Sequence, residues 1–211
     1  MKCLKICAAL AVALNVSSAH AVDNTTLKNT VILTGLITNT FAIHYRDQFK
    51  PCDQVWQFGY QDTKDVEMHA QTARVGWLRC DMDTTDVLPY GITFSVLPTV
   101  LGSVWKTDSG PYNHGNQELA LVPVGQFGLN IGPVILDASF GFGPSLIQHT
   151  TFGSKNKSTH YQFSDEMGVG ISDAKRRMRL DFTYRHISNA DLKKPNNGMN
   201  FVGVGFTYSL N

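Results

Sequence analysis

The sequence predicts an all-β protein, an eight-stranded antiparallel transmembrane β-barrel of a Gram-negative outer membrane. Three observations lead to this prediction: an N-terminal export signal, strands in which apolar residues alternate with polar or small ones, and connections that alternate between short and long. No apolar run reaches the roughly eighteen residues that a transmembrane helix needs. Insertion into a membrane therefore requires a closed barrel, in which neighbouring strands satisfy each other's backbone hydrogen bonds.

Residues 1–21 have the pattern of a secretory signal peptide. Lys2 and Lys5 give a positive start, an apolar run follows over 6–14, and small residues lead to a cleavage site after Ala21. The remaining 190 residues (211 minus 21) suit a single domain. We expect export across the inner membrane followed by insertion into the outer membrane.

The mature chain divides into a segment at 22–52 and a barrel at 53–211. The first segment has no assigned role from its sequence, and a periplasmic plug, a short helix and a further strand pair all remain open. Cys52 and Cys80 stay in the mature chain. An exported pair with no further metal ligands nearby predicts a disulfide, and two free thiols are the alternative.

Residues 178–188 illustrate the alternation. Met178, Leu180, Phe182 and Tyr184 share one face, and the other face carries charged residues, namely Arg179, Asp181 and Arg185. In a soluble sandwich the apolar face would point inward. In an outer-membrane barrel it points to lipid and the charged residues fill the lumen, and the export signal favours this second arrangement.

Eight strands are expected, at 53–62, 70–80, 92–105, 117–128, 131–146, 159–172, 177–188 and 199–210. An even number of strands places both the start of the first strand and the end of the last strand on the periplasmic side. Short periplasmic turns then fall near 129–130 and 173–176, and longer outer loops near 106–116, 147–158 and 189–198. Pro98 and Pro123 lie inside strands and predict bulges, because proline has no N–H for the ladder.

Charge and composition exclude several classes of partner and cofactor. The formal net charge is +1 and the chain has no basic block, so no nucleic acid partner is expected. The histidines outside the seventh strand show no metal-ligand spacing, so no metal is expected, and no glycine-rich phosphate loop occurs. Trp56, Trp77 and Trp105 are expected to face lipid or the membrane interface.

His186 and Ser188 form the candidate catalytic pair. They are two residues apart on a strand, so they share a face, and it is the apolar, lipid-facing one. A histidine beside a hydroxyl can take its proton and make the oxygen a nucleophile. On spacing alone, the alternative of two polar residues at the membrane interface is the commoner one.

The longer pattern narrows this choice. His186-x-Ser188-Asn189-Ala190 followed by Pro195-Asn196-x-Gly198 resembles the lipid A 3-O-deacylase (PagL) family, and Phe163-x-Asp165-x-x-Gly168-x-Gly170 is similar to that family's sixth strand. The resemblance covers roughly 92–211. It implies an eight-stranded barrel that hydrolyses the ester at position 3 of lipid A, releases a 3-hydroxy fatty acid and uses a serine, a histidine and a glutamate without cofactor.

Residue by residue, the resemblance makes His186 the general base and Ser188 the nucleophile. The family's glutamate, fourteen residues after the histidine, is replaced by Asn200. An amide can orient an imidazole but cannot stabilise imidazolium as an anion would. Asp165 is a further candidate for the orienting acid, with Phe163 expected opposite His186 and Asp165 diagonal to it.

Asn189 is a candidate donor to the oxyanion, and turn formation is its alternative role. Lys193 and Lys194 in the last outer loop are candidates to meet lipid A phosphates, or are solvated loop residues. The expected partners are lipid A or lipopolysaccharide as substrate and outer-membrane lipid, with a homodimer left open. The rival functions are a non-catalytic barrel of the same family, with a structural or lipid-binding role, and an acyltransferase.

Overall fold

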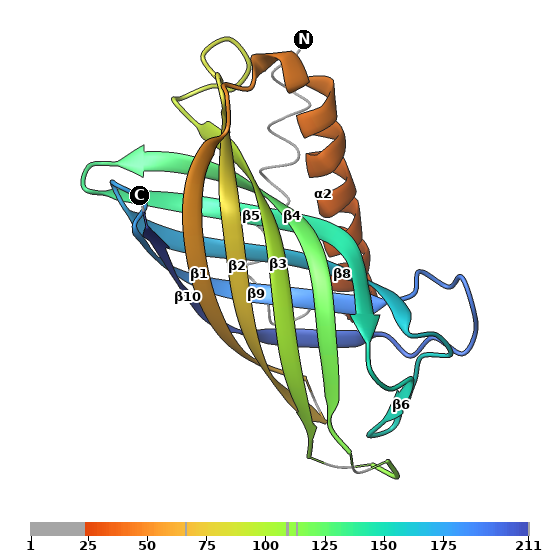
Figure 1. The fold of residues 1–211 in the computed structure, drawn as a ribbon. Helices are drawn as coiled ribbons and strands as arrows, with labels where there is room; N and C mark the ends of the chain where they lie inside the picture. Colours follow the sequence, from red (N-terminus) through yellow and green to blue (C-terminus); the bar gives the residue numbers. More distant parts are fainter. Residues whose placement is uncertain (1–23, 66, 109, 113, 211) are drawn as a thin grey trace.

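The computed structural model describes residues 24–65, 67–108, 110–112 and 114–210, so the expected signal peptide lies outside the described residues. Eight antiparallel strands close into a barrel in the order β1-β10-β9-β8-β5-β4-β3-β2 (Figure 1). They are β1 (Asp53–Lys64), β2 (Met68–Met82), β3 (Thr93–Thr107), β4 (Asn116–Ile131), β5 (Val134–Ile147), β8 (Tyr161–Asp173), β9 (Met178–Ser188) and β10 (Met199–Leu210). This confirms the predicted fold class.

The barrel has two unlike ends. The connections at 132–133 and 174–177 lie at the turn end together with a longer one at 83–92, and the connections at 108–115, 148–160 and 189–198 lie at the loop end together with a short one at 65–67. The 148–160 connection carries a small hairpin of β6 (Thr151–Phe152) and β7 (Lys155–Asn156). The predicted turn at 129–130 is displaced to 132–133, because β4 continues to Ile131.

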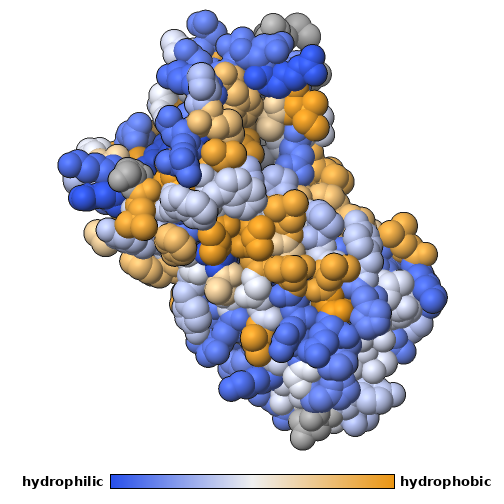
Figure 2. All heavy atoms as spheres, in the orientation of Figure 1, coloured by the Kyte–Doolittle hydropathy of each residue, from blue (hydrophilic) through white to orange (hydrophobic). Residues whose placement is uncertain are grey.

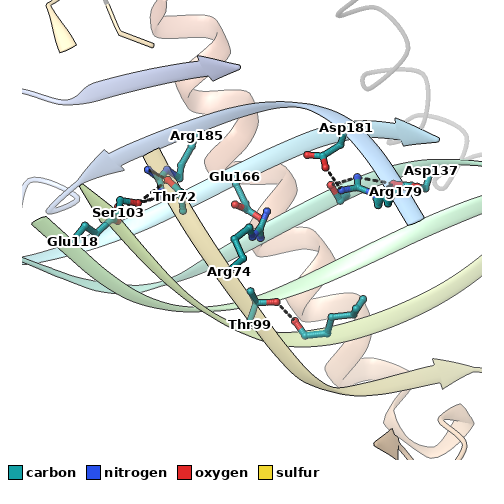
Figure 3. Close-up of polar contacts among 12 residues, drawn as sticks. Thr72, Arg74, Thr99, Ser103, Glu118, Asp137, Glu166, Arg179, Asp181 and Arg185 are labelled. Atoms are coloured by element: carbon teal, nitrogen blue, oxygen red, sulfur yellow. Dashed lines mark hydrogen bonds and ion pairs between the residues drawn. The ribbon is translucent and has the colours of Figure 1, made fainter. Parts of the chain in front are cut away.

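Charged side chains fill the lumen, as the alternation predicts (Figure 3). Arg179 lies 2.7 Å from Asp137 and 2.9 Å from Asp181, and Arg185 lies 3.2 Å from Glu118. Arg74 pairs with Glu166 across the barrel. A buried charge is tolerated only when it is paired, so these contacts compensate for the loss of water inside the barrel.

At the loop end the lumen is apolar. Trp105 is 0% exposed and packs against Phe152 and Phe201, with ring centroids 5.4 and 5.7 Å away. Trp105 therefore faces the lumen, and the prediction that it faces lipid is wrong. Trp56, which is 44% exposed, does lie on the outer wall. The side-chain period of two puts Trp105 on the inward face of β3 together with Ser103.

The outer wall is apolar and exposed. Figure 2 shows hydrophobic residues across the middle of one side, with hydrophilic residues toward both ends. Exposed large apolar residues on this wall include Phe58, Tyr60, Leu119, Leu121, Leu180, Phe182, Val204, Phe206 and Tyr208. A wall of this kind is stable only against lipid or another apolar surface.

The two strand prolines differ in their effect on the ladder. Pro98 and Pro123 face each other in an unbroken β3–β4 register. On its other side, Pro98 adjoins a register shift between β2 and β3, as a bulge would produce. Pairing between β4 and β5 stops next to Pro123 and resumes in the same register, so the bulge predicted there is wrong. Pro144 of β5 lies in the same interrupted stretch, opposite Leu121 in the continued register, so both strands lack a ladder donor there.

Cys52 and Cys80 form a disulfide at the turn end, as predicted. The bond joins the residue before β1 to β2, near the short 3-10 helix η2 (Arg46–Gln48) and the Phe49–Met82 bridge. It closes a sequence separation of 28 residues. The disulfide therefore ties the start of the barrel to its neighbouring strand.

The segment before the barrel contains helix α2 (Asn24–His44), which corresponds to one of the three alternatives expected for this segment. It lies along the outer wall, against β4, β5, β8 and β9 (Figure 1). No helix among the described residues has the length and hydropathy needed to cross a membrane. The helix starts near the loop end and ends near the turn end, where Phe41 contacts Phe94 and Phe127.

Small residues let α2 approach the wall closely. A Cβ on Gly35 would lie 3.1 Å from the Gly141 carbonyl oxygen and from the Phe142 Cβ. Thr38 fills the space over Gly125, where an added Cβ would come within 2.3 Å of its methyl group. The opposite side of the helix exposes Leu33, Leu36, Ile37 and Ile43. One side of helix α2 therefore packs on the barrel wall, and its other side exposes apolar residues as the wall does.

Candidate active site

The candidate site lies on the outer wall at the loop end of β9. His186 is paired directly with Asp165 on β8 and with Asn200 on β10. Ser188, the last residue of β9, is paired with Phe163. The predicted register, with Phe163 opposite His186, is therefore wrong by two residues, because Ser172 on β8 already pairs with Arg179 and the turn begins one residue later.

Asn200 is bonded to the histidine. Its Oδ1 lies 2.7 Å from His186 Nδ1 and also accepts a hydrogen bond of 2.8 Å from the Tyr184 hydroxyl. An amide oxygen can only accept, so His186 Nδ1 carries its proton and Nε2 is left with a lone pair. In this arrangement Nε2 is the basic nitrogen of the ring.

The side of the imidazole that carries Nε2 is buried. His186 is 1% exposed, whereas Phe182, four residues earlier on the same face, is 51% exposed. Among the described residues neither His186 Nε2 nor Asp165 Oδ1 has a hydrogen-bond partner. Buried polar atoms without partners are rare in folded proteins, and where they occur they often mark a site that a ligand completes.

Ser188 stands where the strand ends and the loop begins. Its Oγ accepts a hydrogen bond of 3.5 Å from the Ala190 N–H. Ala190 and Asp191 have positive φ angles of 52° and 60°, which turn the chain sharply away from the wall. The serine, which is 1% exposed, therefore lies at the end of the strand, two residues from His186 and on the same face.

Asn189 has its side chain bound within the loops. Its Nδ2 donates to the Lys157 carbonyl oxygen at 3.1 Å and to the Lys193 carbonyl oxygen at 2.8 Å. Its backbone N–H donates to Asn196 Oδ1 at 3.1 Å. These bonds correspond to the alternative role expected for Asn189, which is to form the turn.

Gly198 makes room for the histidine ring. A Cβ at this position would lie 2.7 Å from His186 Cε1, closer than a carbon contact allows. The sequence predicts no role at the site for Gly198 or Tyr184: Gly198 enters only as part of the family motif, and Tyr184 only as a residue of the apolar face. Tyr184 could have been found from the alternation, because it lies two residues before His186 on the same face.

The lysines of the last loop are exposed and do not reach the pair. Lys194 Nζ lies 3.6 Å from Asp191, with most of its side chain in solvent. Lys193 is exposed as well and contributes its carbonyl oxygen to the loop. Within the described part of the chain no cluster of His, Cys, Asp and Glu could hold a metal ion.

Comparison with known proteins assigns the chain to a family. The model of the family described as lipid A 3-O-deacylase (PagL) matches residues 71–209, which include every residue of the candidate site. The chain belongs to the PagL family. A lipid A deacylase PagL of Bordetella bronchiseptica (strain ATCC BAA-588 / NCTC 13252 / RB50) is 34% identical over 70 residues, and this match spans 33% of the chain and only 39% of the relative.

The crystal structure of the outer membrane enzyme PagL has the same fold. It superposes with a TM-score of 0.57 at 20% identity, over 73% of this chain and 98% of that one. Helix α2 lies before residue 71, outside the region that the PagL family model matches. The helix is thus an addition to the part of the chain that defines PagL family membership.

Proposed function

We propose that this PagL family member is an outer-membrane lipid A deacylase that hydrolyses the ester-linked 3-hydroxyacyl chain at position 3 of lipid A. The observation that carries the proposal is the hydrogen bond from His186 to Asn200, which leaves Nε2 without a partner on the strand face that also carries Ser188. A lipid substrate reaches this wall directly from the bilayer, without entering the lumen.

The proposed reaction begins at Ser188. His186 Nε2 takes the hydroxyl proton while Oγ attacks the ester carbonyl carbon, which forms a tetrahedral oxyanion. The intermediate collapses, the C–O bond to the sugar breaks, and the imidazolium returns the proton to the sugar oxygen. A water molecule then attacks the acyl-serine in the same way and releases the 3-hydroxy fatty acid.

Two features of the site bear on this scheme. Ser188 Oγ is not bonded to Nε2, and bonds between nucleophile and base are often long before substrate binds. The Asn189 side chain is engaged in the loop, so we expect the oxyanion to be bound by backbone N–H groups. The Ala190 N–H, 3.5 Å from Ser188 Oγ, is the first candidate.

The test uses purified, folded protein with lipid A in detergent and measures the 3-hydroxy fatty acid released. Ser188→Ala and His186→Ala should each abolish release, and the double variant should be no worse, because the two residues act as a unit. Ser145→Ala is the matched control, since its buried hydroxyl lies on the lumen side of the barrel wall.

The outcomes separate the rival functions. Full activity in Ser188→Ala would refute the assignment of the nucleophile. Wild-type protein that releases no acid but transfers the acyl chain to an added alcohol is an acyltransferase. Wild-type protein that does neither, although correctly folded, is the non-catalytic barrel.

A further inference from the structure

Lys157 follows β7 in the loop between β7 and β8, and its burial is unusual for a lysine. Its side chain is 0% exposed. Burial in these surroundings lowers the pKa of the Lys157 amine to about 7, and the charge of Lys155 acts in the same direction. Glu118, whose charge acts in the opposite direction, forms its ion pair with Arg185 instead.

The contacts of Lys157 converge on the end of β9. Its Nζ donates to the Ile187 carbonyl oxygen at 2.6 Å, and its own carbonyl oxygen accepts from Asn189 Nδ2 at 3.1 Å. Ile187 and Asn189 are the residues on either side of Ser188. One loop residue thus binds the chain directly before and directly after the proposed nucleophile.

The rest of the loop holds Lys157 in place. Its N–H donates to the Thr150 carbonyl oxygen at 2.8 Å, across the base of the β6–β7 hairpin. Phe152, in the same hairpin, is buried in the apolar cluster that contains Ile187 and Trp105. The hairpin is therefore anchored in the mouth of the barrel, and Lys157 links that anchor to β9.

We propose that Lys157 is a positioning residue, which fixes the backbone around Ser188 so that its hydroxyl stays beside His186. The inference rests on the proposed function of Ser188 and goes beyond it, because the amine of Lys157 is hydrogen-bonded to the chain next to the pair and not to His186 or Ser188 themselves. The last pairs of β9, Ser188 with Phe163 and Ile187 with Met199, lie where the ladder ends, and the Ile187 carbonyl there would lose its buried donor without the amine. A displacement of about 1 Å at a nucleophile is enough to cost orders of magnitude in rate.

The variant that tests this is Lys157→Met, which keeps the length of the side chain and removes the donor. We expect a fall in kcat on the order of tenfold or more, with KM for lipid A changed less than about twofold, because the lipid-binding wall is untouched. Lys175→Met is the control for the same change of side chain, since Lys175 is exposed in the turn between β8 and β9 at the opposite end of the barrel. Heat-dependent gel mobility checks that each variant folds.

A second measurement does not depend on lipid A. A fluorophosphonate reacts with an activated serine, so its rate of attachment to Ser188, read by mass spectrometry of the modified peptide, reports the nucleophile directly. This rate should fall in Lys157→Met in parallel with kcat and stay unchanged in Lys175→Met. Equal labelling and equal kcat in Lys157→Met and wild type would overturn the positioning role alone. Failure of wild-type Ser188 to react at all would instead overturn the proposed function, and the positioning role with it.

Discussion

Asn200 Oδ1 accepts a hydrogen bond of 2.7 Å from His186 Nδ1, across directly paired positions of β9 and β10. The position is the one that the resemblance to the PagL family assigns to a glutamate. The amide fixes the same ring orientation and the same tautomer that a carboxylate would fix. It carries no charge, so it cannot offset the positive imidazolium that forms when Ser188 is deprotonated.

The first prediction concerns this residue. Asn200→Ala should lower the rate of 3-hydroxy fatty acid release by at least about tenfold, because the imidazole loses the group that orients it. Asn200→Glu should keep or raise the wild-type rate, since a carboxylate also stabilises the imidazolium. The rates are compared on purified protein with lipid A in detergent, after folding is verified by gel mobility.

Asp165 provides the contrast for that experiment. It faces His186 from the other side, on β8, and no hydrogen bond joins Asp165 Oδ1 to the ring. Asp165→Asn should therefore be nearly silent. If Asp165→Asn were the damaging change and Asn200→Ala had no effect, the orienting role would belong to Asp165, and the observed bond to Asn200 would be irrelevant to catalysis.

The second prediction concerns Gly198. Because a Cβ there would lie 2.7 Å from His186 Cε1, Gly198→Ala should displace the ring and lower kcat, although only one methyl group is added. Gly102→Ala is the matched control, since a Cβ at that position meets nothing within 4 Å. A Gly198→Ala enzyme as active as wild type would mean that the ring has room to move without loss of function.

The third prediction concerns the disulfide. Replacing Cys52 and Cys80 by serine should lower the free energy of unfolding by roughly 2–4 kcal/mol, because the unfolded chain gains the freedom that the cross-link removes. The bond lies at the turn end, far along the barrel from Ser188, so the deacylation rate of the folded variant should not change. Urea unfolding in detergent, followed by gel mobility, measures the free energy of unfolding. Release of 3-hydroxy fatty acid measures the deacylation rate. An unchanged unfolding curve would show that the cross-link adds nothing to stability.

The sequence predicted the barrel well because the side-chain period of two is a local property. In β9 and β10 the alternation alone separates the lumen residue Arg185 from the wall residues Phe182 and Phe206. The same logic failed for Trp105, because an aromatic residue at a strand end suits both a membrane interface and a closed lumen. Only the packing of Phe152 from a distant loop decides between these environments.

The site was predictable in composition but not in register. His186, Ser188 and Asn200 follow from the motif and from strand alternation, whereas the pairing of β8 with β9 depends on the length of one turn. A shift of two residues there moved Asp165 from a diagonal to a direct neighbour of His186. The residues next to Lys157 in the sequence could not have revealed its role, because its contacts with β9 depend on a loop that folds back into the barrel mouth.

Helix α2 raises the question of how a lipid reaches the site. On the wall below His186, the next residue of the same face is Tyr184, and Val31 of α2 packs with Tyr184, Met167 and Phe140. An acyl chain that extends from Ser188 along this wall therefore meets the surface that α2 occupies.

The fourth prediction is that loosening α2 raises activity. Gly35→Leu places a side chain where even a Cβ would lie 3.1 Å from Gly141 and Phe142, so the helix cannot dock as closely. We expect faster release of 3-hydroxy fatty acid, mainly through a lower KM, because the acyl chain no longer competes with Val31 for the wall. The control is Thr40→Leu, which adds the same side chain at an exposed helix position. A lower rate in Gly35→Leu, with Thr40→Leu unchanged and both proteins folded, would mean the opposite, that α2 helps to form the substrate-binding wall.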